Sequence, residues 1–136
     1  MALVLMQAGL RDELDAELAA RVAGAWRFGL YLGPDVLTPD LVIGDLTVAS
    51  FGGYLGVQPM MTWGLSVWSP PRAVALHPPV SWTSDGTVPA QEVRGYYVID
   101  GSGVLRYAVP RPDGPALVGT AGQVYTIFPR YTRRAE

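Results

Sequence analysis

Residues 10–32, LRDELDAELAARVAGAWRFGLYL, contain the change of pattern on which the fold prediction depends. Aliphatic residues recur every four positions from Leu10 to Val22, which is typical of an amphipathic helix, and Gly24 is a natural place for that helix to end. After Gly24, large apolar residues alternate with other residues up to Leu32, the pattern of a strand with one buried face. The sequence therefore predicts a helix from about Leu10 to just before Gly24, packed on a sheet of the same chain, followed directly by a strand.

The rest of the chain has the pattern of short antiparallel strands. Twelve Pro and sixteen Gly divide the whole sequence, and no second helical pattern follows the first. The clearest pair is 93–99 with 104–109, because the Asp-Gly-Ser-Gly between them is typical of a hairpin turn. Residues 34–47 predict an irregular connection across the edge of the sheet. Further strands are expected at 47–51, 64–68, 72–77 and 123–128, with 72–77 either at a sheet edge or simply ended by the Pro pairs on both sides of it.

These patterns predict a mainly β protein: an antiparallel β-sandwich or jelly-roll-like barrel with one short N-terminal α-helix. A chain of 136 residues is long enough for one domain with a single core. We expect an N-terminal arm and helix over about 3–23, a β core over about 25–129 and a short basic tail over 130–136.

Composition argues against several classes of protein. Ten Arg, no Lys and twelve acidic residues give a net charge of −2, whereas binding to a phosphate backbone ordinarily requires a basic surface. The absence of Cys excludes disulfides and thiolate metal ligands. No stretch approaches the ~20 apolar residues of a membrane span. We therefore expect a protein made in the cytoplasm, with no nucleic acid and no membrane among its partners.

The polar residues match no catalytic or metal-binding motif. His77 is the only histidine, and a packing role is favoured over a general base or a metal ligand. Asp35, Asp40 and Asp45 lie five residues apart and lack the spacing of a calcium loop, although a weak cation site there stays open. We expect no enzyme activity, no catalytic residue, no cofactor and no metal ion.

Candidate interface residues come from the aromatic residues and from the two ends of the chain. Tyr96 and Tyr97 are adjacent in one expected strand, so one of them faces away from the core unless both faces are covered. The arginines at the C-terminus belong either to a free, frayed end or to a segment that docks on an acidic neighbour. Apolar residues before the helix could join the core or another subunit. The candidates are Leu3, Leu5, Met6, Trp68, Trp82, Tyr96, Tyr97, Arg130, Arg133 and Arg134.

Several short motifs carry a resemblance to a known group of proteins. In chain order, the helix is followed by Leu30-Tyr31-Leu32, Phe51-Gly52-Gly53-Tyr54, Gly95-Tyr96-Tyr97-Val98-Ile99-Asp100, Asp113-Gly114-Pro115 and Ile127-Phe128-Pro129. In this order and spacing the chain resembles small structural proteins of tailed bacteriophages, from Leu3 to Arg133. Residues 57–82, rich in Trp and Pro, depart from the resemblance.

The resemblance implies a virion structural protein without enzyme activity, either a capsid decoration (cement) protein or a tail component. A decoration protein would stabilise the shell through contacts of a homo-oligomer, with a trimer favoured, and its partner would be the major capsid protein. The alternative is a tail, baseplate or fibre component that binds a receptor or glycan and contacts tail proteins. In either case the expected location is the virion, after synthesis in the host cytoplasm.

Overall fold

The computed structural model describes residues 6–134, and within them it confirms a mainly antiparallel β protein with one N-terminal α-helix, consistent with a β-sandwich. The helix α1 (Gln7–Ala23) is accompanied by a short 3-10 helix, η1 (Ile43–Asp45). The strands are β1 (Arg27–Gly33), β2 (Thr47–Val48), β3 (Gln58–Pro59), β4 (Val67–Ser69), β5 (Arg72–Leu76), β6 (Val80–Thr83), β7 (Gln91–Val93), β8 (Gly95–Ile99), β9 (Leu105–Pro110), β10 (Ala116–Val118), β11 (Val124–Ile127) and β12 (Arg130–Arg134).

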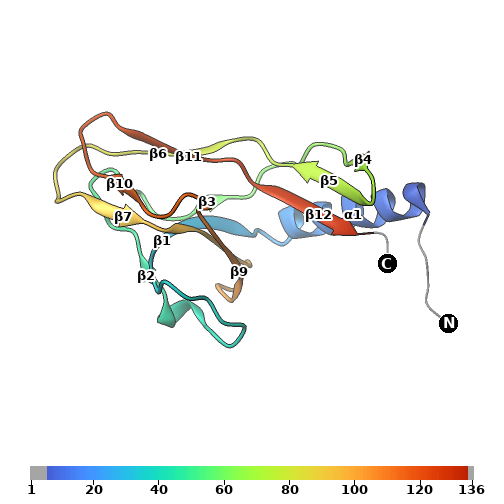
Figure 1. Cartoon of the computed structure of the whole chain (residues 1–136), viewed down its shortest axis with the longest axis horizontal. Helices are drawn as coiled ribbons and strands as arrows, with labels where there is room; N and C mark the ends of the chain where they lie inside the picture. Colours follow the sequence, from blue (N-terminus) through green and yellow to red (C-terminus); the bar gives the residue numbers. More distant parts are fainter. Residues whose placement is uncertain (1–5, 135–136) are drawn as a thin grey trace.

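A long two-stranded ladder runs along the molecule (Figure 1). β5 and β6 follow each other on one side of the ladder, and β11 and β12 follow each other on the other side. Pro78 and Pro79 interrupt the pairing between its two halves because proline has no amide hydrogen to donate. At this interruption the amide of His77 donates to the carbonyl of Pro129 over 2.9 Å, which keeps the two sides together.

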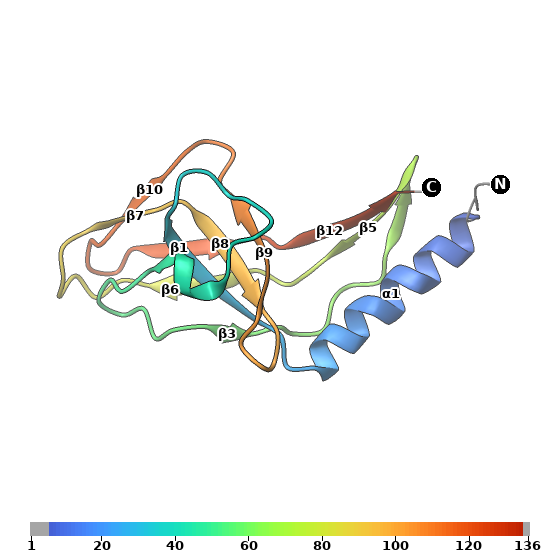
Figure 2. The same cartoon turned by 90° about the horizontal axis from the view of Figure 1, so that it is seen from below.

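At one end of the ladder, α1 covers one face of a three-stranded sheet with the order β12-β5-β4 (Figure 2). We call the face under the helix the inner face. The side of the helix that faces the sheet carries Leu10, Leu14 and Leu18, and at most 1% of each leucine is exposed. Ala73 and Ala75 of β5 are fully buried in the same core, and their small side chains let the helix lie close to the strand. The predicted packing of the helix on its own sheet is therefore correct.

Polar contacts fix α1 to both sides of this sheet. On the β4 side, Arg11 Nε donates to the carbonyl of Ser66 over 3.1 Å, and the Ser66 amide donates to Asp15 Oδ1 over 2.9 Å. On the β12 side, the Arg133 guanidinium lies 2.8 Å from Glu17 Oε2 and 3.7 Å from Glu13 Oε2. Polar and charged groups thus fix the position of the helix on the sheet, together with its buried leucines.

At the other end of the molecule, β1 and β8 form the centre of a sheet with both faces covered. One face contributes Phe28 and Val98 to the main core. The opposite face carries Tyr31 and Tyr97, which pack with Leu46 and other residues of the connection between β1 and β2. Both tyrosines are almost completely buried, with 1% and 4% exposed. The connection predicted to cross the sheet edge therefore covers a whole face.

The predicted hairpin is confirmed. β8 pairs with β9, and Asp100 Oδ1 accepts hydrogen bonds from the amides of Ser102 and Val104, over 2.8 and 3.0 Å. Gly103 has a φ of +85°, which L side chains rarely adopt. The helix end at Gly24 is also confirmed, since its amide donates to the Ala20 carbonyl.

Other predictions for the β half need correction. Strand 72–77 is not at an edge, because β5 lies between β12 and β4, so only its termination by prolines agrees with the structure. Residues 130–134 are not a frayed tail but form β12, and the β core extends through them. The sequence patterns missed β3, β6 and β10, and they joined β7 to β8 across Arg94.

His77 holds two segments together near the interruption of the ladder. Its side chain is 5% exposed and packs edge-to-face on Phe28 and Trp63, at centroid distances of 4.9 and 5.1 Å. The Met61 amide donates to Nε2 over 2.7 Å, so Nδ1 carries the proton and donates to the Pro78 carbonyl, also over 2.7 Å. Burial lowers the pKa of this imidazole below its ordinary value.

Protonation of His77 should destabilise the fold. The second proton would occupy Nε2, where the Met61 amide now donates, so the unfolded chain binds a proton more readily than the native chain. Native stability should be complete above the ordinary histidine pKa of about 6.5 and fall as the pH drops through the lower native pKa. Urea unfolding between about pH 7.5 and 5.5 measures this loss, and His77→Gln should reduce it. An equal pH dependence in both proteins would contradict the prediction.

The leucine stripe of α1 should account for much of the stability. Truncation of Leu14, which is completely buried, should lower the free energy of unfolding by about 2–5 kcal/mol because it leaves a cavity under the helix. Asp12→Ala, on the exposed side of the same helix, serves as the control. A melting temperature of Leu14→Ala equal to that of the control would show that the helix does not stabilise the sheet.

Candidate interaction surface

The three-stranded sheet has a second face, turned away from α1, that no element among residues 6–134 covers. Antiparallel register places Val67 opposite Val74, and Leu76 opposite Arg130, on this side. Val67 is 65% exposed and Leu76 59%, whereas their neighbours Ala73 and Ala75 point to the helix and are buried. We call this surface the outer face. Its residues are Leu65, Val67, Ser69, Arg72, Val74, Leu76, Arg130, Thr132 and Arg134.

The outer face is apolar and slightly hollow. A depression of about 420 Å³ lies over it, with Leu65, Val67, Val74 and Leu76 among its walls and Arg130 at its border. Leu65, just before β4, is 81% exposed. Exposed apolar surface of this kind on a folded chain is a candidate site for binding another molecule.

A groove next to the outer face carries three arginines. It has a volume of about 510 Å³ and lies between β11–β12 and the end of β9. Arg72, Arg111 and Arg130 line it, together with apolar residues such as Val109 and Phe128, and none of its lining residues is acidic. We call it the arginine groove. Arg130 belongs to both surfaces, which makes them continuous.

The groove arginines differ in their charge partners from four other arginines of the chain. Arg21, Arg94, Arg106 and Arg133 each form an ion pair with a carboxylate. Within residues 6–134, no such pair involves the arginines of the groove. Arg111 is positioned by its own turn, since its Nε donates to the Gly114 carbonyl over 2.9 Å. The groove is thus a concentration of positive charge in a chain with a net charge of −2.

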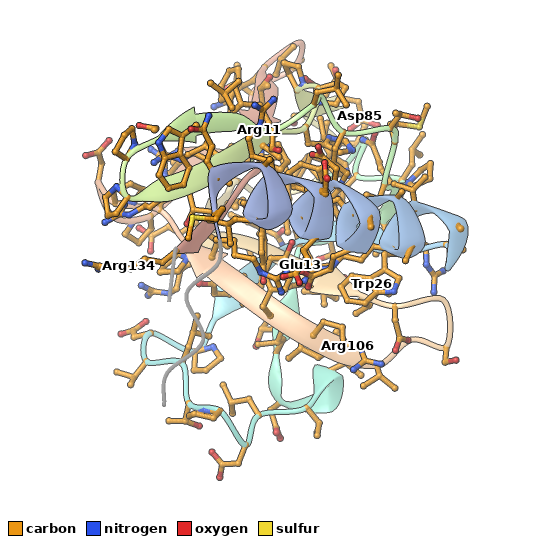
Figure 3. The ribbon with its side chains drawn as sticks, turned by 90° about the vertical axis from the view of Figure 1, so that its right-hand side faces the viewer. Arg11, Glu13, Trp26, Asp85, Arg106 and Arg134 are labelled. Atoms are coloured by element: carbon orange, nitrogen blue, oxygen red, sulfur yellow. The ribbon has the colours of Figure 1, made fainter. Side chains whose placement is uncertain are left out.

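The C-terminal candidate arginines point in different directions. Arg130 and Arg134 occupy outer-face positions of β12, opposite Leu76 and Arg72. Arg133 points to the inner side, where it pairs with Glu13 and Glu17 of α1. Figure 3 shows this end of the molecule, with Glu13 and Arg11 on opposite sides of the helix. Arg133 therefore anchors the helix, a role that the sequence did not predict.

Arg21, on α1 itself, has an anchoring role similar to that of Arg133. Arg21 is 9% exposed and pairs with Glu17 over 2.6 Å. Its guanidinium also stacks on Trp26 and Tyr131, 4.7 and 4.4 Å from the ring centroids. In Figure 3, Trp26 lies below the helix beside Arg106, whose guanidinium is 5.6 Å from the same ring. This cluster joins the end of α1 to β12 and the β8–β9 hairpin.

The structure removes two of the aromatic candidates from the surface. Trp82 is 2% exposed and donates its Nε1 hydrogen to the Gly56 carbonyl over 2.9 Å. Tyr97 is buried under the connection between β1 and β2, so covering of both sheet faces explains the Tyr96-Tyr97 pair. Tyr96 is half-buried and lines the arginine groove.

The remaining candidates are distributed as follows. Trp68 is half-buried and faces inward beside Ala73. Met6, directly before α1, is 74% exposed. Leu3 and Leu5 lie outside the described residues.

The three aspartates of the connection do not converge on one point. Asp35 pairs with Arg94 over 2.7 Å, and Asp45 Oδ2 accepts the Val42 amide over 2.9 Å as a cap of η1. A hydrogen bond from Thr38 holds the pKa of Asp40 below its ordinary value. Residues 6–134 contain no group of three or more His, Asp or Glu side chains arranged to hold a metal ion.

No helix of the described chain is both long enough and apolar enough to cross a membrane. Comparisons with protein families, with characterised proteins and with solved structures give no match for this chain.

The outer face was missed at the level of sequence, although a signal for it exists. Strand 72–76 reads Arg-Ala-Val-Ala-Leu, with small alanines on one side and larger apolar residues on the other. A strand with one solvated face ordinarily alternates apolar with polar residues. Large aliphatic residues at Val74 and Leu76 therefore indicate a second contact surface.

The outer face should bind a hydrophobic dye in the native state. Val67→Thr with Leu76→Thr should reduce the fluorescence of bound ANS and leave the melting temperature nearly unchanged, because both side chains are largely exposed. Val48→Thr with Leu117→Thr, on strands of the other sheets, is the control. Equal dye binding by wild type and both variants would contradict the assignment of the outer face.

Proposed function

We propose that this chain is a structural subunit of a tailed-phage virion, specifically a capsid decoration protein that docks through the outer face. The observation that carries the proposal is the exposed aliphatic surface of Val67 and Leu76, with the half-buried Val74 beside them, on a sheet whose other face is filled by α1. The resemblance of the sequence motifs to small phage structural proteins supplies the biological setting.

The small area of the outer face suits a weak contact that is repeated by many copies of the protein. One three-stranded sheet offers too small an area for a strong bimolecular complex, but many copies on a regular shell add their contacts through multivalency. Arginines bordering an apolar centre favour partners with carboxylates at matching positions. We therefore expect the partner, a regularly repeated capsid subunit, to offer an apolar surface with an acidic border.

A tail or fibre component that binds a glycan is the second candidate. Such sites commonly offer exposed aromatic rings to the sugar. The burial of Trp82 and Tyr97 leaves those two rings inaccessible, which is why we place this function second.

Charge placed on the outer face should prevent incorporation into particles. Leu76→Glu introduces a carboxylate into the proposed contact, where its desolvation is costly even with Arg130 as the cross-strand neighbour. The matched control is Leu117→Glu on β10, since Leu117 is 62% exposed and Leu76 59%. After complementation of a phage that lacks the wild-type protein, we expect purified particles to contain Leu117→Glu at normal levels and little Leu76→Glu.

Two results would count against this function. Equal incorporation of both folded variants would remove the outer face from the attachment site. Absence of the wild-type protein from purified particles would reject the virion assignment, and a copy number far below that of the capsid protein would favour the tail candidate.

A further inference from the structure

The acidic connection that contains η1 is complementary to the arginine groove. We infer that the arginine groove of one copy receives residues 34–45, the acidic loop, of a second copy. The inference rests on the proposed function only for the expectation that many copies are present together. The proposed function uses the outer face and assigns no partner to the arginine groove, and this inference supplies that partner.

The groove is built for a ligand that is both apolar and anionic. Three guanidinium groups, from Arg72, Arg111 and Arg130, lie around walls formed in part by Val109 and Phe128. Phe128 is 73% exposed, although it is among the largest apolar side chains of the chain. An isolated inorganic anion would satisfy the arginines and leave this apolar surface in water, so a polypeptide segment with both kinds of side chain fits better.

The acidic loop offers this combination. It contains Asp35, Asp40 and Asp45, one carboxylate for each groove arginine. Val36 and Val42 in the same loop are 73% and 60% exposed, so they can cover the apolar walls. Asp35 already contacts Arg94, but its side chain is 72% exposed and retains free acceptor positions.

The two surfaces lie on different sides of the molecule. In Figure 1 the acidic loop projects at the bottom, below β2, whereas β11 runs along the top. Because the two surfaces lie on different sides of the molecule, two copies cannot each place their loop in the other's groove. The contact is therefore heterologous, and it propagates from copy to copy until a ring closes. A closed ring is the expected assembly, and the sequence resemblance favours a trimer.

Charge reversal on each side, and on both sides together, tests the inference. The reversed-groove variant is Arg72→Glu with Arg111→Glu, which leaves intact Arg130, the arginine that lines both the groove and the depression of the outer face. The reversed-loop variant is Asp35→Arg with Asp40→Arg, which leaves the cap at Asp45 intact. The charge-swap variant combines all four changes. Asp12→Arg with Glu92→Arg, a matching pair of charge reversals at exposed positions outside the loop and the groove, is the control.

Sedimentation of the isolated full chain over a range of concentrations gives the association constant. We expect wild type and the control variant to form the same closed oligomer. Each reversed variant should associate at least about tenfold more weakly, because attraction becomes like-charge repulsion, and the charge-swap variant should recover most of the loss. Melting temperatures identify any variant that fails to fold, and single changes Arg111→Gln and Asp40→Asn then replace the reversals.

Three outcomes would overturn the inference: a wild-type monomer at all concentrations, unchanged association of a folded reversed variant, or no recovery in a folded charge-swap variant. Weak association of the reversed groove alone would instead identify an acidic surface outside the loop as its occupant. These results are independent of particle incorporation, which tests the proposed function. A chain that is monomeric in solution but enters particles would reject the loop contact alone.

Discussion

A single helix can cover only one face of a sheet, and this constraint shapes the whole molecule. The leucines of α1 fill the inner face of the β12-β5-β4 sheet, where Ala73 and Ala75 let the helix approach closely. Within the described chain nothing remains to cover the opposite side. The same packing that forms the core therefore leaves the aliphatic residues of the outer face in contact with solvent, available to another molecule.

Charged residues in this protein serve two separate purposes. Arg11, Arg21 and Arg133 fix the helix to the sheet through hydrogen bonds, ion pairs and aromatic contacts. Arg72 and Arg130, on the other side of the same sheet, have no carboxylate partner within residues 6–134. Arginine suits both purposes, because its planar guanidinium can stack on aromatic rings and also bind carboxylates in pairs. Which purpose a strand arginine serves depends on whether its position in the strand faces α1 or the outer face.

Local patterns predicted the elements whose neighbours in space are also neighbours in sequence. The helix, its end at Gly24 and the β8–β9 hairpin belong to this group. β12 was missed because Arg-Tyr-Thr-Arg-Arg is polar and pairs with a strand about sixty residues earlier in the chain, which no local signal reveals. Tyr97 is among the interface candidates because the residues that cover it come from an irregular connection, which the sequence pattern does not place. The outer face is formed by residues of β4, β5 and β12 together. Only the pairing register of these three strands shows which of their residues lie on the same side of the sheet.

We expect the outer face to become covered when the protein is assembled on a particle. Amide hydrogen exchange of the isolated chain and of the same chain on purified particles measures this directly. Exchange should be slower on particles in β4, β5 and β12, with little change in β10. Unchanged exchange across those three strands in protein confirmed to be on the particle would contradict this expectation.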